Sequence, residues 1–211
     1  MRILVIGASK GTGAAAVQIA LEHGHDVTAF CRSPQKLGIA HPKLRPTAGD
    51  FHDPASVAAA VPGHDAVILT ASAASLGAFK ENPTYFSQGT RNVIDAMRAS
   101  GVKRLAVLSA LGAGESRRLA GFLVDKLLIS WILKVPFEDH ERQEKLVRES
   151  GLEWVIARPS RLTNGPARRK YLKQPDVAPV PGSISRADVA DFLVEAAETD
   201  RWVGQAVQLG G

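Results

Sequence analysis

Cysteine is almost absent from this 211-residue chain, and aromatic residues are scarce. The single cysteine, Cys31, excludes an internal disulfide framework and suits a reducing compartment. The composition is nevertheless that of a folded protein, because 45% of the residues are hydrophobic and 22% are charged. A chain of this length can bury a sizeable core as one unit. The sequence therefore predicts a single cytoplasmic domain spanning residues 1–211.

Long hydrophobic runs are also missing. The most apolar segment, 121–137, contains Asp125, Lys126 and Lys134 and is shorter than the ~20 residues that a membrane span requires. This pattern is typical of a buried helix in a soluble protein. The N-terminal "RILVIG" is typical of a β-strand rather than of a secretion signal. We expect no membrane segment and no export signal.

Neither the positive charges nor the histidines are clustered in the sequence. The formal net charge is +5, but the one dense run, Arg168, Arg169 and Lys170, lies in a loop without interleaved aromatic residues. Five of the histidines show no metal-ligand spacing with cysteine or carboxylates, namely His23, His25, His41, His52 and His64. The sequence thus predicts no nucleic-acid partner and no metal.

Short β-branched runs alternate with amphipathic stretches along the whole chain. The expected strands are 2–7, 26–32, 43–50, 65–71, 104–110, 153–159 and 206–211. The expected helices are 13–24, 53–61, 82–101, 139–151 and 185–199. This alternation builds a parallel sheet with helices on both faces. The predicted fold class is α/β, a Rossmann-type doubly wound parallel sheet.

Local signals mark several helix boundaries. Asp53 and Asn82 each precede a proline, which predicts an N-cap followed by proline at the first helical position. Helix ends are expected at Gly24, Gly101 and Gly151. The segment 162–181, rich in proline and basic residues, leaves two interpretations open, a substrate lid and a solvated connection.

A glycine-rich turn, "VIGASKGTGAAAVQIA" at residues 5–20, joins the first expected strand to a helix. Gly7 permits a tight turn, Gly11 lets the backbone approach a pyrophosphate, and Gly13 lets the helix pack closely on the strand. Free N–H groups and the helix dipole favour an anion at this helix end. The residues predicted to bind a dinucleotide here are Gly7, Ala8, Ser9, Lys10, Gly11, Thr12 and Gly13.

The spacing G-x-x-x-G-x-G resembles that of the short-chain dehydrogenase/reductase superfamily. The resemblance is strongest to the atypical branch that contains biliverdin-IXβ reductase (flavin reductase), on "CRSPQKL", "GTRNVIDAMRASGVKRLAVLSA" and "DHERQEKLVRESGLEWVIARP". It implies cofactor contacts at the ends of later strands, in "AGDFHDP", "LTASA" and "ARPSRLTNG". The residues so implied are Asp50, Phe51, Ala71, Ser72 and Pro159.

The turn departs from that branch, whose members usually read G-A-T-G-x-T-G. Ser9, Lys10 and Gly11 replace the middle, as in NADP-using conventional members, where a basic residue faces the 2′-phosphate of adenosine. Arg32 and Ser33 follow the second strand, where NAD-specific folds place a carboxylate. Two solvated surface cations are the alternative interpretation, but their joint position favours NADP(H) as the cofactor.

The usual catalytic pair of the superfamily, Tyr-x-x-x-Lys, is absent. Neither Tyr85 nor Tyr171 has a lysine four residues later, and Phe122 stands at that distance before Lys126. Phenylalanine cannot pass a proton, which disfavours alcohol oxidation, epimerisation and dehydration in the usual mode. The reaction that is left is hydride delivery to a planar conjugated acceptor. Flavins, quinones and linear tetrapyrroles are such acceptors, and the resemblance implies the same classes.

Two residues are candidates for the chemistry. Ser109 follows the fifth expected strand and would bond the nicotinamide or the substrate, or it merely caps the strand end. His140, in "FEDHERQEK", matches a histidine of the family segment and would orient substrate or relay a proton, or it is a surface histidine among the solvated Glu138, Asp139 and Glu141.

Two functions from different classes follow. The first is an NADPH-dependent reductase of small conjugated molecules. The second is a non-catalytic redox sensor resembling the NmrA-like regulators, which bind the dinucleotide and report it to a protein partner. The oligomeric state stays open, and Cys31 beside Arg32 is expected to be a buried strand residue rather than an oxidant sensor.

Overall fold

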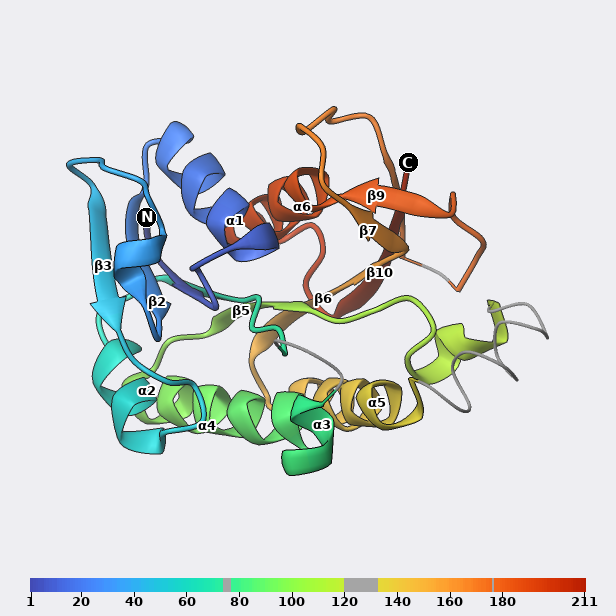
Figure 1. The fold of residues 1–211 in the computed structure, drawn as a ribbon, viewed down its shortest axis with the longest axis horizontal. Helices are drawn as coiled ribbons and strands as arrows, with labels where there is room; N and C mark the ends of the chain where they lie inside the picture. The colour runs from blue at the N-terminus through green and yellow to red at the C-terminus, as the bar shows by residue number, and fades with distance from the viewer. Residues whose placement is uncertain (74–76, 120–132, 176) are drawn as a thin grey trace.

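The computed structural model describes residues 1–73, 77–119, 133–175 and 177–211. Figure 1 shows a central sheet seen nearly edge-on, with helices above and below it. The strands are β1 Arg2–Ile6, β2 Asp26–Cys31, β3 Leu44–Ala48, β4 Ala66–Leu69, β5 Arg104–Leu108, β6 Glu153–Pro159, β7 Arg161–Thr163, β8 Leu172–Gln174, β9 Ser183–Ser185 and β10 Gln205–Gly210. The α-helices are α1 Gly11–Glu22, α2 Pro54–Ala60, α3 Ala78–Glu81, α4 Tyr85–Ser100, α5 Lys134–Arg148 and α6 Arg186–Glu198, and the 3₁₀ helices are η1 Pro34–Lys36 and η2 Gly114–Leu119.

The main sheet has the strand order β3-β2-β1-β4-β5-β6-β10-β8. Neighbouring strands are parallel except for β8, which pairs antiparallel with β10 at one edge. The order reverses between β1 and β4, so the chain winds outward in both directions from β1. The predicted doubly wound α/β fold is confirmed.

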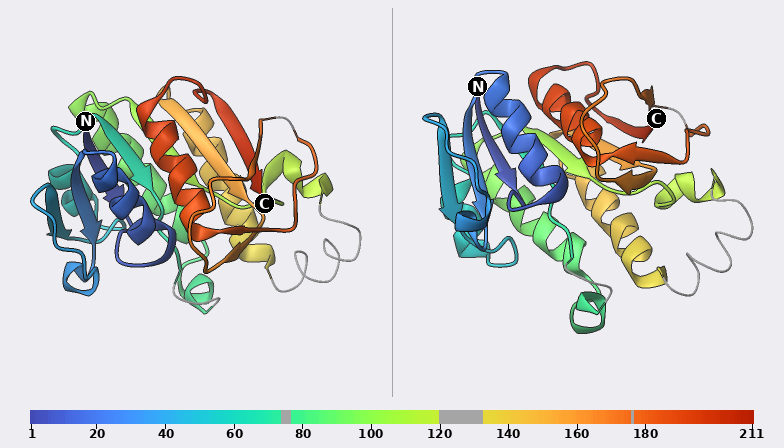
Figure 2. Two further views of the ribbon diagram at one scale, coloured as in Figure 1. Left: turned by 90° about the horizontal axis from the view of Figure 1, so that it is seen from above. Right: turned by 45° about the horizontal axis from the view of Figure 1, so that its top comes forward.

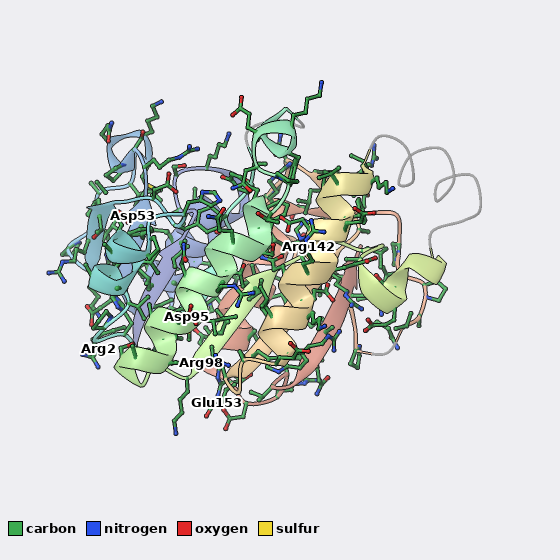
Figure 3. The ribbon with its side chains drawn as sticks, turned by 90° about the horizontal axis from the view of Figure 1, so that it is seen from below. Arg2, Asp53, Asp95, Arg98, Arg142 and Glu153 are labelled. Carbon is green, nitrogen blue, oxygen red and sulfur yellow. The ribbon has the colours of Figure 1, made fainter. Side chains whose placement is uncertain are left out.

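Each face of the sheet has its own apolar core. Ile3 and Val5 pack with residues of α1 and α6, whereas Leu4 and Ile6 pack with residues of α2 and α4. Successive side chains of a strand point to opposite faces, so a fully apolar strand supplies both cores at once. Figure 3 shows α4 and α5 side by side on the second face, with Arg142 on α5.

The expected helix ends agree with the structure. Gly24, Gly101 and Gly151 all adopt positive φ, at +84°, +75° and +70°, just beyond α1, α4 and α5. Asp53 is the N-cap of α2, and its side chain accepts a hydrogen bond from the backbone N–H of Ala55. The C-terminal ends of α1, α4 and α5 and the N-cap of α2 could therefore be predicted from the local sequence.

The expectation that Asn82 caps α4 is wrong. Asn82 is the C-cap of α3, and α4 begins at Tyr85 with Thr84 as its N-cap. Two orphan N–H groups of α4, those of Phe86 and Ser87, donate instead to Oδ2 of Asp139 on α5, at 2.6 and 3.4 Å. Asp139 is fully buried, so the expectation that it is solvated is also wrong. A cap from a distant helix leaves no signal in the local sequence.

The segment 162–181 is tied down at several points. β8 pairs with the sheet edge, and the carboxylate of Asp188 accepts hydrogen bonds from the backbone N–H groups of Arg168 and Arg169. The Tyr171 hydroxyl donates to Asp191 of α6 at 2.9 Å. These contacts anchor the basic run to α6, which neither interpretation of the loop anticipated.

Most of the apolar segment 121–137, including Phe122, Lys126 and Trp131, lies outside the described residues. The part that is described opens α5 at Lys134, five residues before the expected start at Asp139. Within the described ranges, no helix is long and apolar enough to cross a membrane.

Candidate functional site

The glycine-rich turn is held against the end of β4. Gly7 has φ +87°, and a Cβ on it would lie 2.7 Å from the backbone of Ala71. A Cβ on Gly13 would lie 2.2 Å from the carbonyl oxygen of Gly7 and 2.6 Å from Oγ1 of Thr70. That hydroxyl donates to the carbonyl oxygen of Ile6 at 2.9 Å. Only glycine permits this approach of α1 to the strands.

We expect Gly13→Ala to lower the free energy of unfolding by about 1–3 kcal/mol, since the new methyl group requires the turn and α1 to move apart. Urea denaturation followed by circular dichroism measures the change. Gly182→Ala is the matched control, because a Cβ there meets nothing within 4 Å. Equal losses for the two variants would contradict the packing argument.

The N-terminus of α1 presents unsatisfied backbone N–H groups. Lys10 occupies the N-cap in an extended conformation, and its own side chain makes no capping hydrogen bond. Such a terminus favours an anion through its N–H groups and dipole. Arg186 of α6 lies beside the turn, since a Cβ on Gly11 would meet its Cδ at 3.4 Å. Its Nη1 donates to Asn164 Oδ1 at 2.7 Å. Sequence reasoning had missed Arg186 and had named Asn164 only as part of the segment "ARPSRLTNG".

A pocket of about 420 Å³ opens next to this turn, at the carboxyl ends of β1, β2 and β3. Its lining includes the predicted cofactor residues Gly7, Ser9, Lys10, Arg32, Ser33, Asp50, Phe51, Ala71 and Ser72. The other lining residues are Ile6, Phe30, Cys31, Lys36, Gly49 and Tyr85. Of the remaining predicted residues, Ala8 and Thr12 are buried beneath the turn, and Pro159 ends β6.

Three cations line this pocket. They are the predicted residues Lys10 and Arg32 and a third residue, Lys36. Lys36 is the last residue of η1, and sequence reasoning had not singled it out. Within the described part of the chain, none of the three makes an ion pair. Asp50, the acidic residue of the lining, is paired with His52, with Oδ1 and Nδ1 3.3 Å apart. With three cations and one carboxylate, the lining of the pocket offers a net positive charge to a ligand.

An aromatic wall closes one side of the pocket. The ring of Phe51 packs against Tyr85, at 5.4 Å between centroids, and occupies the space that a Cβ on Gly89 would fill. The Tyr85 hydroxyl donates to the carbonyl oxygen of Ser72 at 3.3 Å. Burial raises the pKa of the Tyr85 phenol, although Arg32 acts in the opposite direction. Cys31 is buried as expected, and burial raises the pKa of its thiol.

Ser109 lies at the end of β5 and is buried. Its hydroxyl donates to Glu144 Oε1 at 2.7 Å. Glu144 in turn accepts from Arg158, a fully buried arginine that also donates to Glu115 with both terminal nitrogens at 3.0 Å. The hydrogen bonds from Arg158 hold the pKa of Glu115 at about 2. The candidate serine is thus part of an ionic cluster in which Glu144 and Arg158 are buried and Glu115 is half-exposed.

His140 lies on α5 against α4. Its ring stacks on Phe86, with centroids 4.1 Å apart, and Nδ1 lies 2.9 Å from Gln143 Oε1. Burial lowers the pKa of His140, so the imidazole is neutral at pH 7. Ser109 thus contacts α5, and His140 contacts α4. The described structure shows no hydrogen bond between the two candidate residues.

A match to a known family decides the class of ligand. Residues 7–200 match the family described as NAD(P)H-binding. The chain belongs to the NAD(P)H-binding family. The glycine turn, the exposed helix N-terminus and the cationic pocket are all features that suit the phosphates of such a cofactor.

Several known proteins are similar to this NAD(P)H-binding protein in sequence or in structure. An uncharacterized chloroplastic protein of Arabidopsis thaliana is 28% identical over 205 residues, which is 92% of this chain and 71% of the relative. The sanguinarine reductase of Eschscholzia californica is 25% identical over 254 residues, 100% of this chain and 89% of that one. The solved structure of ChuY, an anaerobillin reductase from Escherichia coli O157:H7, has a TM-score of 0.80 at 23% identity and covers 100% of this chain and 97% of its own.

Proposed function

We propose that the protein is an NADPH-dependent reductase that delivers hydride to a planar conjugated acceptor. The observation that carries the cofactor preference is a set of three cations around one pocket, Lys10, Arg32 and Lys36, none of which forms an ion pair with a described residue. A 2′-phosphate distinguishes NADPH from NADH. Its negative charge would pair with these three cations. Arg32 would offer a planar fork of donors and the lysines would offer point charges.

The predicted site residues have distinct places in this proposal. The pyrophosphate would lie on the turn from Gly7 to Gly13 and on the N-terminus of α1, with Arg186 beside it. Asp50, Phe51, Ala71 and Ser72 would border the adenine, together with Ser33. Pro159 and Ser109, at the ends of β6 and β5, would border the nicotinamide half.

The proposed reaction needs little acid from the protein. NADPH supplies a hydride, the acceptor gains that hydride and one proton from solvent, and NADP⁺ is released. A conjugated acceptor spreads the developing negative charge, which makes Tyr-x-x-x-Lys dispensable. The names of the anaerobillin and sanguinarine reductases support a reductase. We further propose that residues 1–211 act as one cytoplasmic domain on a small molecule, without nucleic acid.

A non-catalytic redox sensor is the second candidate function. The observation that favours it is that both candidate catalytic groups are already engaged, Ser109 with Glu144 and His140 with Gln143 and Phe86. A sensor would bind the reduced and the oxidised cofactor with similar affinity and would not accelerate their interconversion.

The deciding experiment follows NADPH oxidation at 340 nm with FMN, riboflavin, a short-chain quinone and biliverdin, with NADH in parallel. We expect turnover with at least one acceptor, faster with NADPH than with NADH. Tight NADPH binding without turnover would instead support the sensor. Ser109→Ala tests the serine, and Ser100→Ala, at the opposite end of the sheet on α4, is its control.

A further inference from the structure

Two histidines and a glutamate meet at the end of the sheet remote from the glycine turn. His23 Nδ1 lies 2.7 Å from Glu198 Oε1, and His25 Nε2 lies 2.6 Å from the same oxygen. The three ligand atoms all lie within 4.8 Å of one another. The sequence showed no metal spacing here because Glu198 is 173 residues from His25.

These residues come from three adjoining elements. His23 is the C-cap of α1, His25 directly precedes β2, and Glu198 is the last residue of α6. Figure 2 shows α1 in blue and α6 in red lying side by side over the sheet, so their ends converge. The glycine turn is at the opposite end of α1, one helix length away.

The donor set suits a transition-metal ion. Two imidazole nitrogens and a carboxylate oxygen are ligands of Zn²⁺ in proteins, where water completes the coordination. The side chains are partly buried, with 36% of His23, 13% of His25 and 23% of Glu198 exposed. An ion could therefore reach the cluster from solvent while its ligands remain held by packing.

Without an ion, one carboxylate oxygen joins both rings. This carboxylate oxygen and the two ring nitrogens are the atoms that would bind a cation. The two ring nitrogens face this anion, and neither is paired with a second acidic side chain among the described residues.

We propose that His23, His25 and Glu198 bind a divalent d-block cation, with Zn²⁺ as the probe, and that the ion joins the C-terminal ends of α1 and α6. The site is separate from the NAD(P)H pocket, so the proposal does not depend on the reductase function. Its role is to fix α1, the helix whose other end faces the cofactor, against α6.

The test is calorimetric titration of tag-free, EDTA-treated protein with Zn²⁺. We expect one ion per chain, and Zn²⁺ at a hundred times its Kd should raise the melting temperature by roughly 5–10 °C. His23→Ala and Glu198→Gln should each weaken binding at least ~10–100-fold. His41→Ala, which removes an exposed histidine outside the cluster, should leave binding unchanged.

Two results would overturn the proposal. One is wild-type protein that neither binds Zn²⁺ nor gains stability from it, which would make the cluster a hydrogen-bonded clamp only. The other is equal Zn²⁺ affinity in the wild type and in both cluster variants. Circular dichroism of the variants in EDTA verifies that they are folded, so a loss of binding is not a loss of structure.

Discussion

Arg158→Met is expected to lower the free energy of unfolding by about 3–5 kcal/mol. Arg158 is fully buried and lies between two carboxylates, Glu144 and Glu115. Its removal leaves the carboxylate of Glu144, itself only 3% exposed, with Ser109 and with Arg148 at 3.6 Å. An ionised group in that position has lost both water and its closest counter-charge. The measurement is urea denaturation monitored by circular dichroism.

A double variant separates the ionic effect from simple loss of packing. Arg158→Met combined with Glu144→Leu removes the orphaned charge and should be more stable than Arg158→Met alone. Arg2→Met is the matched surface control, because the Arg2–Asp65 pair is exposed and should contribute at most about 1 kcal/mol. A double variant as unstable as the sum of its single variants would show that the charges do not interact.

The same cluster connects stability with the candidate chemistry. Glu144 accepts from both Ser109 and Arg158, so the position of the Ser109 hydroxyl depends on a charge that lies between β6 and α5. If Ser109 contacts the nicotinamide or the substrate, Arg158 is a positioning residue for it.

The sheet and its helices could be predicted because their signals are local. Apolar strands such as Arg2–Ile6 bury both faces, and the glycines after α1, α4 and α5 adopt the left-handed conformation that ends a helix. The short strands β7, β8 and β9 gave no such signal. They span three residues each, and their pairing depends on partners distant in the chain.

The polar face of α5 shows why part of the site was missed. Asp139, Gln143 and Glu144 look like solvated residues of an exposed helix, yet all three are buried. Their partners, the N-terminus of α4, Thr90 and Arg158, come from other elements. Arg186 and Tyr85 also come to the site from other elements, α6 and α4. Lys36 is only four residues from Arg32, and its place in the lining depends on the single turn of η1.

Arg32→Glu should weaken NADPH binding by at least about 1–3 kcal/mol, roughly 5- to 150-fold, and leave NADH binding much less affected. The variant removes a donor that we place on the 2′-phosphate and puts a negative charge beside Lys10 and Lys36. NADH has no phosphate at that position, so it escapes the repulsion. Calorimetric Kd values for both cofactors measure the difference.

Milder variants and a remote control sharpen this test. Lys10→Ala and Lys36→Ala should each weaken NADPH binding selectively, and their effects together should not simply add, because both act on one anion. Lys103→Glu makes the same charge reversal on an exposed residue before β5, at the opposite end of the sheet. It should leave the ratio of the Kd values for NADPH and NADH unchanged. Equal losses of NADPH and NADH in Arg32→Glu would place the guanidinium away from the 2′-phosphate. The cationic pocket would then bind the part that both cofactors share.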